Sequence, residues 1–282
     1  MRRGAIGLGL LCGACAYVPP PGDPAPPDRP APAPSGGPAL PTATRWDGGA
    51  YCRAPFSGAF GWADPIGHVL GFTEAVEHLA IVQSAVTARG LCVPSPDLGA
   101  NDEVDVDGDW NFLVRLDPGQ ERLLAEGNFD PNYGGGLGAE IVATDLPAPA
   151  RPVPGDRVTL RGDWVVDCWH DFAQAEIHPA FALLVERGDE RLVNVVRRSG
   201  VFTDLVDGIR DDRVDPAAEV ELVLVPPGTP LSGQRAVLES TLERLASGVV
   251  REDASSAADG VHLQLTLAEE GHYYGRFLVA WR

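Results

Sequence analysis

The segment Asp156–Trp169 reads DRVTLRGDWVVDCW and decides the fold class. Every second residue from Val158 to Cys168 is apolar or glycine, which is the period of a β-strand with one buried face. One of these residues is Gly162. A glycine inside a long strand allows the sharp bend that the corner of a small barrel needs. The segment therefore predicts a long strand that bends within a closed barrel.

Four further strand-like segments lie on either side of this one. They are His78–Ala88, Trp110–Leu116, the stretch AEIVATDL from Ala139, and Ala175–Glu186. The second of them places Trp110, Phe112, Val114 and Leu116 on one face. No long helical period interrupts residues 78–186. We therefore expect an all-β fold built on a five-stranded, oligomer-binding (OB)-like barrel.

The remainder of the chain, residues 187–282, also favours strands. Apolar alternation is present in RLVNVV, EVELVLV, VHLQLTL and YGRFLVAW. The last two runs, with an EEG turn between them, predict a terminal hairpin. The stretch Gly233–Ser247 fits either an amphipathic helix or an edge strand. We expect a small β-rich, sandwich-like domain here.

The amino terminus, MRRGAIGLGLLCGACAY, has the layout of a secretory signal. Arg2 and Arg3 precede an apolar run that is too short to span a membrane, and two small residues precede Cys15. These residues resemble a bacterial lipobox, except that Cys12 stands where an aliphatic residue is usual. We expect cleavage before Cys15 and lipidation of that cysteine. The alternative is an ordinary signal peptide that is cut nearby.

A proline-rich segment follows the signal. Residues 16–45 contain eleven prolines and almost no apolar side chains to bury, so we expect an extended, unfolded tether. The expected organisation is a signal with its lipidated cysteine at 1–15, the tether at 16–45, the barrel domain with an irregular lead-in at 46–186, and the second domain at 187–282. Neither Ala16 nor Tyr17 is an aspartate of the inner-membrane retention type. This favours an exported lipoprotein of the outer membrane or cell surface.

The charge of the chain disfavours nucleic acid as a partner. Without residues 1–14, 20 arginines remain against 40 acidic residues, a net charge of −20. So acidic a body repels phosphate backbones and anionic lipid headgroups. The expected partners are the membrane, through the lipid anchor, and an unidentified protein or ligand in the envelope.

Three cysteines lie beyond the signal, and an exported protein is expected to form disulfides. We predict a Cys52–Cys92 disulfide, because both cysteines lie in loop-like sequence near proline or glycine. Cys168 alternates with apolar neighbours and fits a small buried hydrophobic residue. No C-x-x-C pair occurs beyond the signal, which argues against a cysteine zinc site.

The chemically richest stretch is DCWHDFAQAEIHP, Asp167–Pro179. Because residues i and i+2 share a face of a strand, Glu176 and His178 point the same way. A hairpin could bring them near Asp167 and His170. Imidazoles and carboxylates are ligands for zinc or another divalent metal ion, and they also handle protons. They equally satisfy buried backbone groups, so a structural network, a metal site and a catalytic site all remain open.

A second acidic stretch, EVDVDGDW, contains Asp105, Asp107 and Asp109. Calcium takes such oxygen ligands, but the EF-hand pattern fails because Val114 stands where its glutamate is required. The stretch also fits a solvated Asp-Gly turn.

Residues of about 78–186 resemble an uncharacterised OB-like module of bacterial exported proteins. The features that carry the resemblance are an Asp-x-x-His motif at Asp167 and His170 and the later Glu-Ile-His-Pro run that ends at Pro179. Asn111 departs from the histidine often found there. The resemblance implies a fold and no settled activity. Our first hypothesis is a non-catalytic envelope lipoprotein that binds or organises a partner. The alternative is a metal-dependent, nuclease-like hydrolase.

Overall fold

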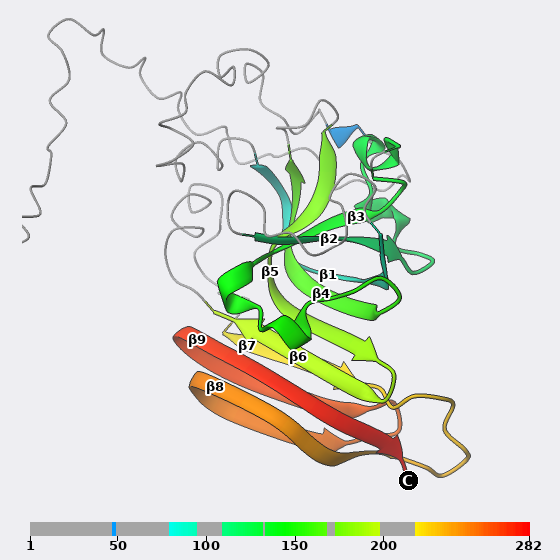
Figure 1. The fold of residues 1–282 in the computed structure, drawn as a ribbon, viewed down its shortest axis with the longest axis vertical. Helices are drawn as coiled ribbons and strands as arrows, with labels where there is room; N and C mark the ends of the chain where they lie inside the picture. The colour runs from blue at the N-terminus through cyan, green and yellow to red at the C-terminus, as the bar shows by residue number, and fades with distance from the viewer. Residues whose placement is uncertain (1–46, 49–78, 95–108, 132, 168–172, 198–217) are drawn as a thin grey trace, which may run out of the picture. The chain divides into compact units, whose positions relative to one another are not determined.

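The computed structural model describes residues 47–48, 79–94, 109–131, 133–167, 173–197 and 218–282 (Figure 1). The described residues contain no α-helix, so the all-β prediction is confirmed. The strands are β1 (Leu79–Val93), β2 (Asp109–Leu116), β3 (Leu137–Val142), β4 (Arg157–Asp167), β5 (Gln174–Arg187), β6 (Glu190–Val196), β7 (Glu219–Leu224), β8 (Ala236–Ser256) and β9 (Val261–Trp281). Short 3₁₀ turns span Glu121–Leu123, Glu126–Phe129, Ala143–Asp145 and Ala148–Ala150.

The first five strands close into a barrel. β1 pairs antiparallel with β2 and β4, β2 with β3, and β4 with β5. A short parallel pairing, Gly138 with Glu176 and Ala139 with Ile177, joins β3 to β5 and completes the circuit. The resulting order, β1-β2-β3-β5-β4-β1, is that of an OB-like barrel, as the sequence predicts.

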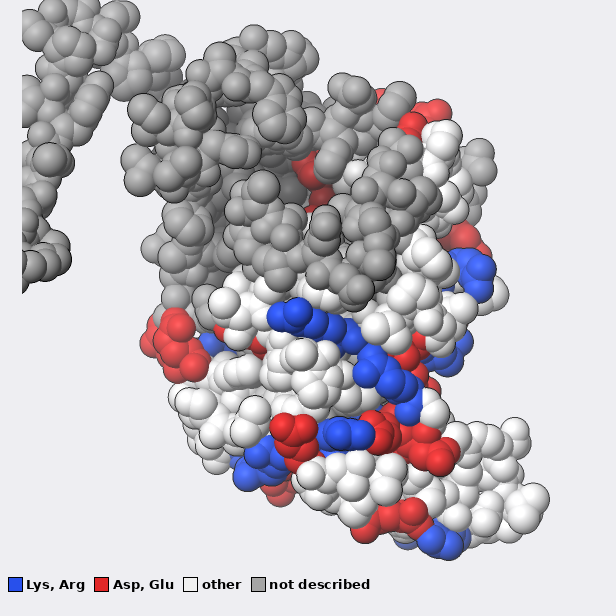
Figure 2. Space-filling model, in the orientation of Figure 1, with Lys and Arg blue, Asp and Glu red and all other residues white. Residues whose placement is uncertain are grey.

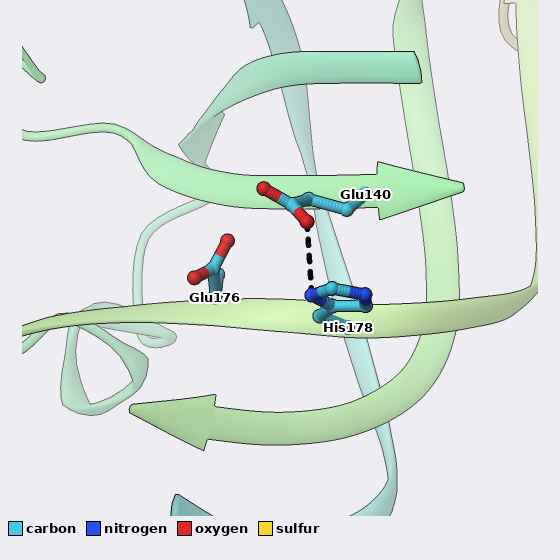
Figure 3. A group of neighbouring side chains, drawn as sticks. All are labelled: Glu140, Glu176 and His178. Atoms are coloured by element: carbon cyan, nitrogen blue, oxygen red, sulfur yellow. Dashed lines mark ion pairs between the residues drawn. The ribbon is translucent and has the colours of Figure 1, made fainter. Parts of the chain in front are cut away.

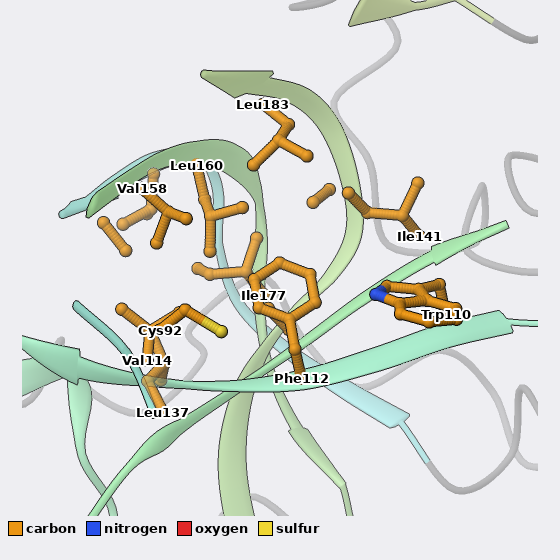
Figure 4. Close-up of a cluster of buried hydrophobic side chains, with 14 of the residues drawn as sticks. Cys92, Trp110, Phe112, Val114, Leu137, Ile141, Val158, Leu160, Ile177 and Leu183 are labelled. Atoms are coloured by element: carbon orange, nitrogen blue, oxygen red, sulfur yellow. The ribbon is translucent and has the colours of Figure 1, made fainter. Parts of the chain in front are cut away.

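The barrel interior is filled by the alternating side chains that the sequence places inward (Figure 4). Trp110, Phe112 and Val114 of β2 are buried there, and Leu116 packs partly buried against them. From β4 the same core receives Val158, Leu160, Trp164 and Val166. The indole Nε1 of Trp164 donates a hydrogen bond to the carbonyl of Leu123 at 3.1 Å, so burying this ring leaves no polar atom unsatisfied.

β5 contributes to two cores, which explains why its apolar run AFALLV is continuous. Ala180, Leu183 and Val185 face the barrel interior. Phe181 and Leu184 belong instead to a second core. That core is completed by side chains of β6, β7 and β9: Val193, Val195, Val220, Leu222, Leu224, Val261, Leu263, Leu265, Leu267, Tyr273, Phe277 and Val279.

The strands after the barrel continue its sheet. β6 pairs with β5 and with the second half of β9, whereas β7 pairs with the first half of β9. β8 pairs with β9 over most of the length of both (Figure 1). Both halves of β9 line the second core, so β9 bends between them. The stretch Gly233–Ser247 therefore lies mostly within a strand, which settles the alternative that its sequence left open.

The predicted terminal hairpin at AEEG is wrong. Residues 261–281 form one strand, and the turn that precedes it is at Ala257–Gly260, where the Ala257 N–H donates to the Gly260 carbonyl. AEEG is a bend: Glu270 has a φ of 59°, and the adjacent Gly271 faces Gly248 of β8. A Cβ on Gly248 would meet the Gly271 Cα at 2.9 Å, so the two glycines let both strands bend together.

Among the described residues, no helix is long and apolar enough to cross a membrane.

Gly162 lies where the backbone of β5 approaches β4 closely. A Cβ there would lie 2.4 Å from the Pro179 carbonyl oxygen and 2.5 Å from Cγ2 of Ile177. The register of β4 against β5 shifts at this residue. Gly162 therefore provides the close backbone approach at the barrel corner.

We expect Gly162→Ala to lower the free energy of unfolding by at least about 2 kcal/mol, because the new methyl group overlaps backbone that cannot move freely. Urea denaturation of the full chain measures this loss. Gly188→Ala is the control: Gly188 has a φ of 56° and open space around its Cα, so only backbone strain of about 1 kcal/mol is expected. Equal losses for the two variants would contradict the close-approach role.

Candidate functional site

The candidate site lies on the seam where β3 and β5 pair. On β5, Ile177 is buried in the barrel core, so Glu176 and His178 on either side of it project from the opposite face of the strand. On β3, Glu140 alternates in the same way with the core residue Ile141. The parallel pairing of Gly138 with Glu176 then sets Glu140 beside the two β5 side chains.

Three side chains converge at this seam (Figure 3). Nδ1 of His178 lies 2.9 Å from Oε2 of Glu140. One donor atom from each of Glu140, Glu176 and His178 lies within 4.8 Å of the others. Glu176 is only 2 % exposed, and the His178 and Glu140 side chains are 11 % and 22 % exposed. The cluster is therefore largely withdrawn from solvent.

Gly138 makes room for the buried carboxylate. A Cβ on this glycine would lie 3.0 Å from Cβ of Glu176 and 3.1 Å from its Oε2. A side chain at position 138 would require the Glu176 side chain to shift by a few tenths of an ångström. The glycine thus favours the observed position of the Glu176 side chain.

Burial and neighbouring charge change the acidity of Glu176. The pKa of its carboxyl is raised well above 4.5, first because burial disfavours the charged form, and then because Glu140 and Asp167 are negatively charged neighbours. Hydrogen bonds to those two carboxylates also favour the protonated form and raise the pKa further. Without a bound cation, Glu176 therefore tends to keep its proton and share it with an adjacent carboxylate.

The structure brings together some of the residues that the sequence singles out. Glu176 and His178 lie in the cluster. Asp167, at the end of β4, interacts with Glu176 but lies outside the set of three donors. His170 falls outside the described residues, so a four-ligand set of Asp167, His170, Glu176 and His178 stays a prediction.

Glu140 is the member that the sequence does not reveal. It lies in the third strand, more than thirty residues before Glu176. Only the parallel β3–β5 pairing brings it to the seam. Its alternation with Ile141 is a signal that it points away from the core, but nothing local indicates which strand it faces.

Asn128 stabilises the backbone next to the β3–β5 pairing. Like Glu140, it was not predicted from the sequence. It is fully buried, and its Oδ1 accepts hydrogen bonds from the N–H groups of Ala125 and Ala175, each at 2.9 Å. Its Nδ2 donates to the carbonyls of Gly136 and Ala175. One amide side chain therefore ties the loop before β3 to the start of β5, next to Glu176.

Several other candidates lie wholly or partly outside the described residues. Asp105, Asp107, Cys15 and Cys52 are among them, so the calcium site, the lipidation and the Cys52–Cys92 disulfide stay predictions. Cys92 itself is buried in the barrel core.

A second histidine cluster lies on the surface. His262 bonds to Glu221 at 2.7 Å and to Asp259 at 2.9 Å, and these hydrogen bonds raise its pKa. Glu221 and Asp259 have side chains that are 50 % and 69 % exposed, so this is a solvated ion-pair group.

Comparisons with protein-family models, curated proteins and solved structures find no match to this chain. The resemblance to an exported OB-like module therefore stays a prediction. The donors of the candidate site are suited either to sharing a proton between buried carboxylates or to holding a cation between carboxylate and imidazole.

The pH dependence of stability tests the buried state of Glu176. As pH rises above 4.5, the unfolded chain loses this proton before the folded chain does, so the folded state binds more protons and its stability falls until the raised pKa is passed. We expect Glu176→Gln, which is neutral and of the same shape, to flatten this fall and to be more stable than the unmutated chain at pH 8.

The measurement is urea denaturation between pH 4.5 and 9 with a chelator present. Glu126→Gln, at an exposed glutamate, is the matched control and should keep the slope of the unmutated chain. A Glu176→Gln variant that also keeps that slope would show that Glu176 does not carry the proton.

Proposed function

We propose that this chain is a non-catalytic lipoprotein of the bacterial cell envelope. In this proposal, Cys15 carries the lipid, residues 16–45 form the spacer, and the OB-like barrel with its added strands is a binding or scaffold module. The observation that carries the non-catalytic part is the burial of the polar cluster, because Glu176 is only 2 % exposed. A hydrolase needs its reacting groups in a cleft that a substrate can enter.

The filled barrel supports the same proposal. Trp164, Ile177 and Leu160 occupy the interior with no exposed surface, so the barrel serves as a packed support and not as a container. Small barrels of this size are filled by their own side chains, and ligands bind on their outer faces and loops. A binding role would therefore use the outside of the module.

The distribution of charge argues against a nucleic-acid partner. On the described part of the face in Figure 2, arginine side chains lie among acidic ones and form no continuous basic surface. Several arginines are already paired: Arg276 with Glu190, Arg244 with Glu252, and Arg157 with Asp117. A phosphate backbone would have to compete with these carboxylates as well as with the net negative charge.

The hydrolase alternative keeps one supporting feature, which is the set of metal-type donors at the seam. A buried ion between two strands fits a structural role better than a hydrolytic one, because catalytic metal sites keep a position open to substrate and water. We therefore propose a structural role, and not a catalytic one, for these three side chains.

The anchoring proposal is tested by replacing single cysteines in the full chain. We expect Cys15→Ser to abolish incorporation of labelled palmitate and to move the protein out of the membrane fraction of a lipoprotein-processing bacterial host, because a thioether-linked lipid needs the thiol. Cys12→Leu, which brings the signal closer to the usual lipobox, is the control and should stay lipidated. Acylation that persists in Cys15→Ser would contradict the assignment.

A further inference from the structure

We infer that Glu140, Glu176 and His178 form a binding site for one divalent transition-metal ion, of the zinc or manganese class, which fastens β3 to β5. The inference goes beyond the proposed function, since neither a lipid anchor nor a scaffold role requires an ion. It also differs in composition from the ligand set that the sequence suggests, because Glu140 joins Glu176 and His178 while Asp167 stands outside.

The first observation is the convergence of donors from two strands. One donor atom from each of the three side chains lies within 4.8 Å of the others, and His178 Nδ1 already lies 2.9 Å from Glu140 Oε2. Zinc binds nitrogen and oxygen ligands at about 2.0–2.2 Å, so its ligand atoms lie about 3–4 Å apart. Small side-chain movements would bring all three donors to that spacing around one ion.

The second observation is an unsatisfied buried atom. Oε1 of Glu176 is buried and has no hydrogen-bond partner among the described residues. Buried carboxylate oxygens are nearly always paired, so one that is not requires an explanation. The Glu176 carboxylate lies beside Glu140 and His178 (Figure 3), and a cation bound among the three side chains would remove the repulsion between the carboxylates.

The third observation is that the backbone keeps the space for this carboxylate. Gly138 lies opposite Glu176, and a Cβ there would meet its Oε2 at 3.1 Å. The absence of a side chain at position 138 of β3 therefore leaves room for the Glu176 carboxylate of β5 beside Glu140.

The chemistry of the donors selects the class of ion. One imidazole and two carboxylates suit zinc, manganese or iron(II), whereas calcium and magnesium prefer oxygen donors alone. The ion would take the place of the proton that the cluster otherwise shares. Binding should therefore strengthen as pH rises, since protons and metal compete for the same carboxylate and imidazole.

The test is a titration of the purified full-length chain, stripped of ions with a chelator, with ZnCl₂, MnCl₂, CaCl₂ and MgCl₂ in separate experiments. Calorimetry gives affinity and stoichiometry, and thermal unfolding gives stability. We expect one equivalent of Zn²⁺ or Mn²⁺ to bind and to raise Tm by on the order of 5 °C, with much weaker binding of Ca²⁺ and Mg²⁺. Glu176→Gln and His178→Ala should each weaken this binding at least about 10-fold.

Two controls make the outcome decisive. His262→Ala disrupts the exposed histidine–carboxylate cluster and should leave the one-equivalent binding unchanged. Glu176→Gln keeps the shape of the side chain, so a Tm in chelator no lower than that of the unmutated chain shows that lost binding does not come from lost folding. The absence of saturable binding, or binding that Glu176→Gln leaves intact, would overturn the inference. Neither result would bear on the proposed lipid anchor at Cys15, which the Cys15→Ser experiment tests separately.

Discussion

The parallel contact between β3 and β5 is the constraint on which the structure depends. Two residue pairs, Gly138 with Glu176 and Ala139 with Ile177, close the circuit of five strands. So short a pairing provides few backbone hydrogen bonds, and its neighbours must hold it in place. Asn128 does so with four hydrogen bonds that tie the loop before β3 to the start of β5. The core packs beneath the same contact, since Ile177 has no exposed surface.

Closing the barrel at this point has an electrostatic consequence. The alternation that sends Ile177 and Ile141 into the core turns Glu176, His178 and Glu140 to the opposite face of the same two strands. With Glu176 buried, the carboxylates cannot all remain charged without a counter-ion. A proton or a metal ion must compensate, and which of them does so depends on pH and on the supply of metal. The stability of the β3–β5 pairing that closes the barrel therefore depends on pH and on the metal ions available.

The sequence predicts this fold well where the information is local. The five barrel strands, the inward positions of Trp110 and Trp164, and the irregularity at Gly162 all follow from a period of two and one glycine. The site was only partly predictable, because Glu140 reaches Glu176 through a parallel pairing of strands that are not neighbours in the chain. The wrong hairpin at AEEG has a similar cause. A glycine after two acidic residues favours a turn locally, but the pairing of both halves of β9 with β8 makes it a bend.

The long strand β8 has features that hinder unwanted pairing with a strand of another chain. Among the described residues, β8 pairs only with β9, and four large apolar side chains on it are exposed: Leu238, Leu242, Leu245 and Val250. Such an edge is a template for unwanted strand pairing. Its register shifts at four places, and Arg244 and Arg251 form ion pairs with Glu252 and Asp253 of the same strand. Bulges and charges of this kind make a regular ladder with another strand difficult. The apolar positions on β8 can therefore remain exposed without offering a regular ladder to another strand, and a partner would have to match this irregular edge to bind there.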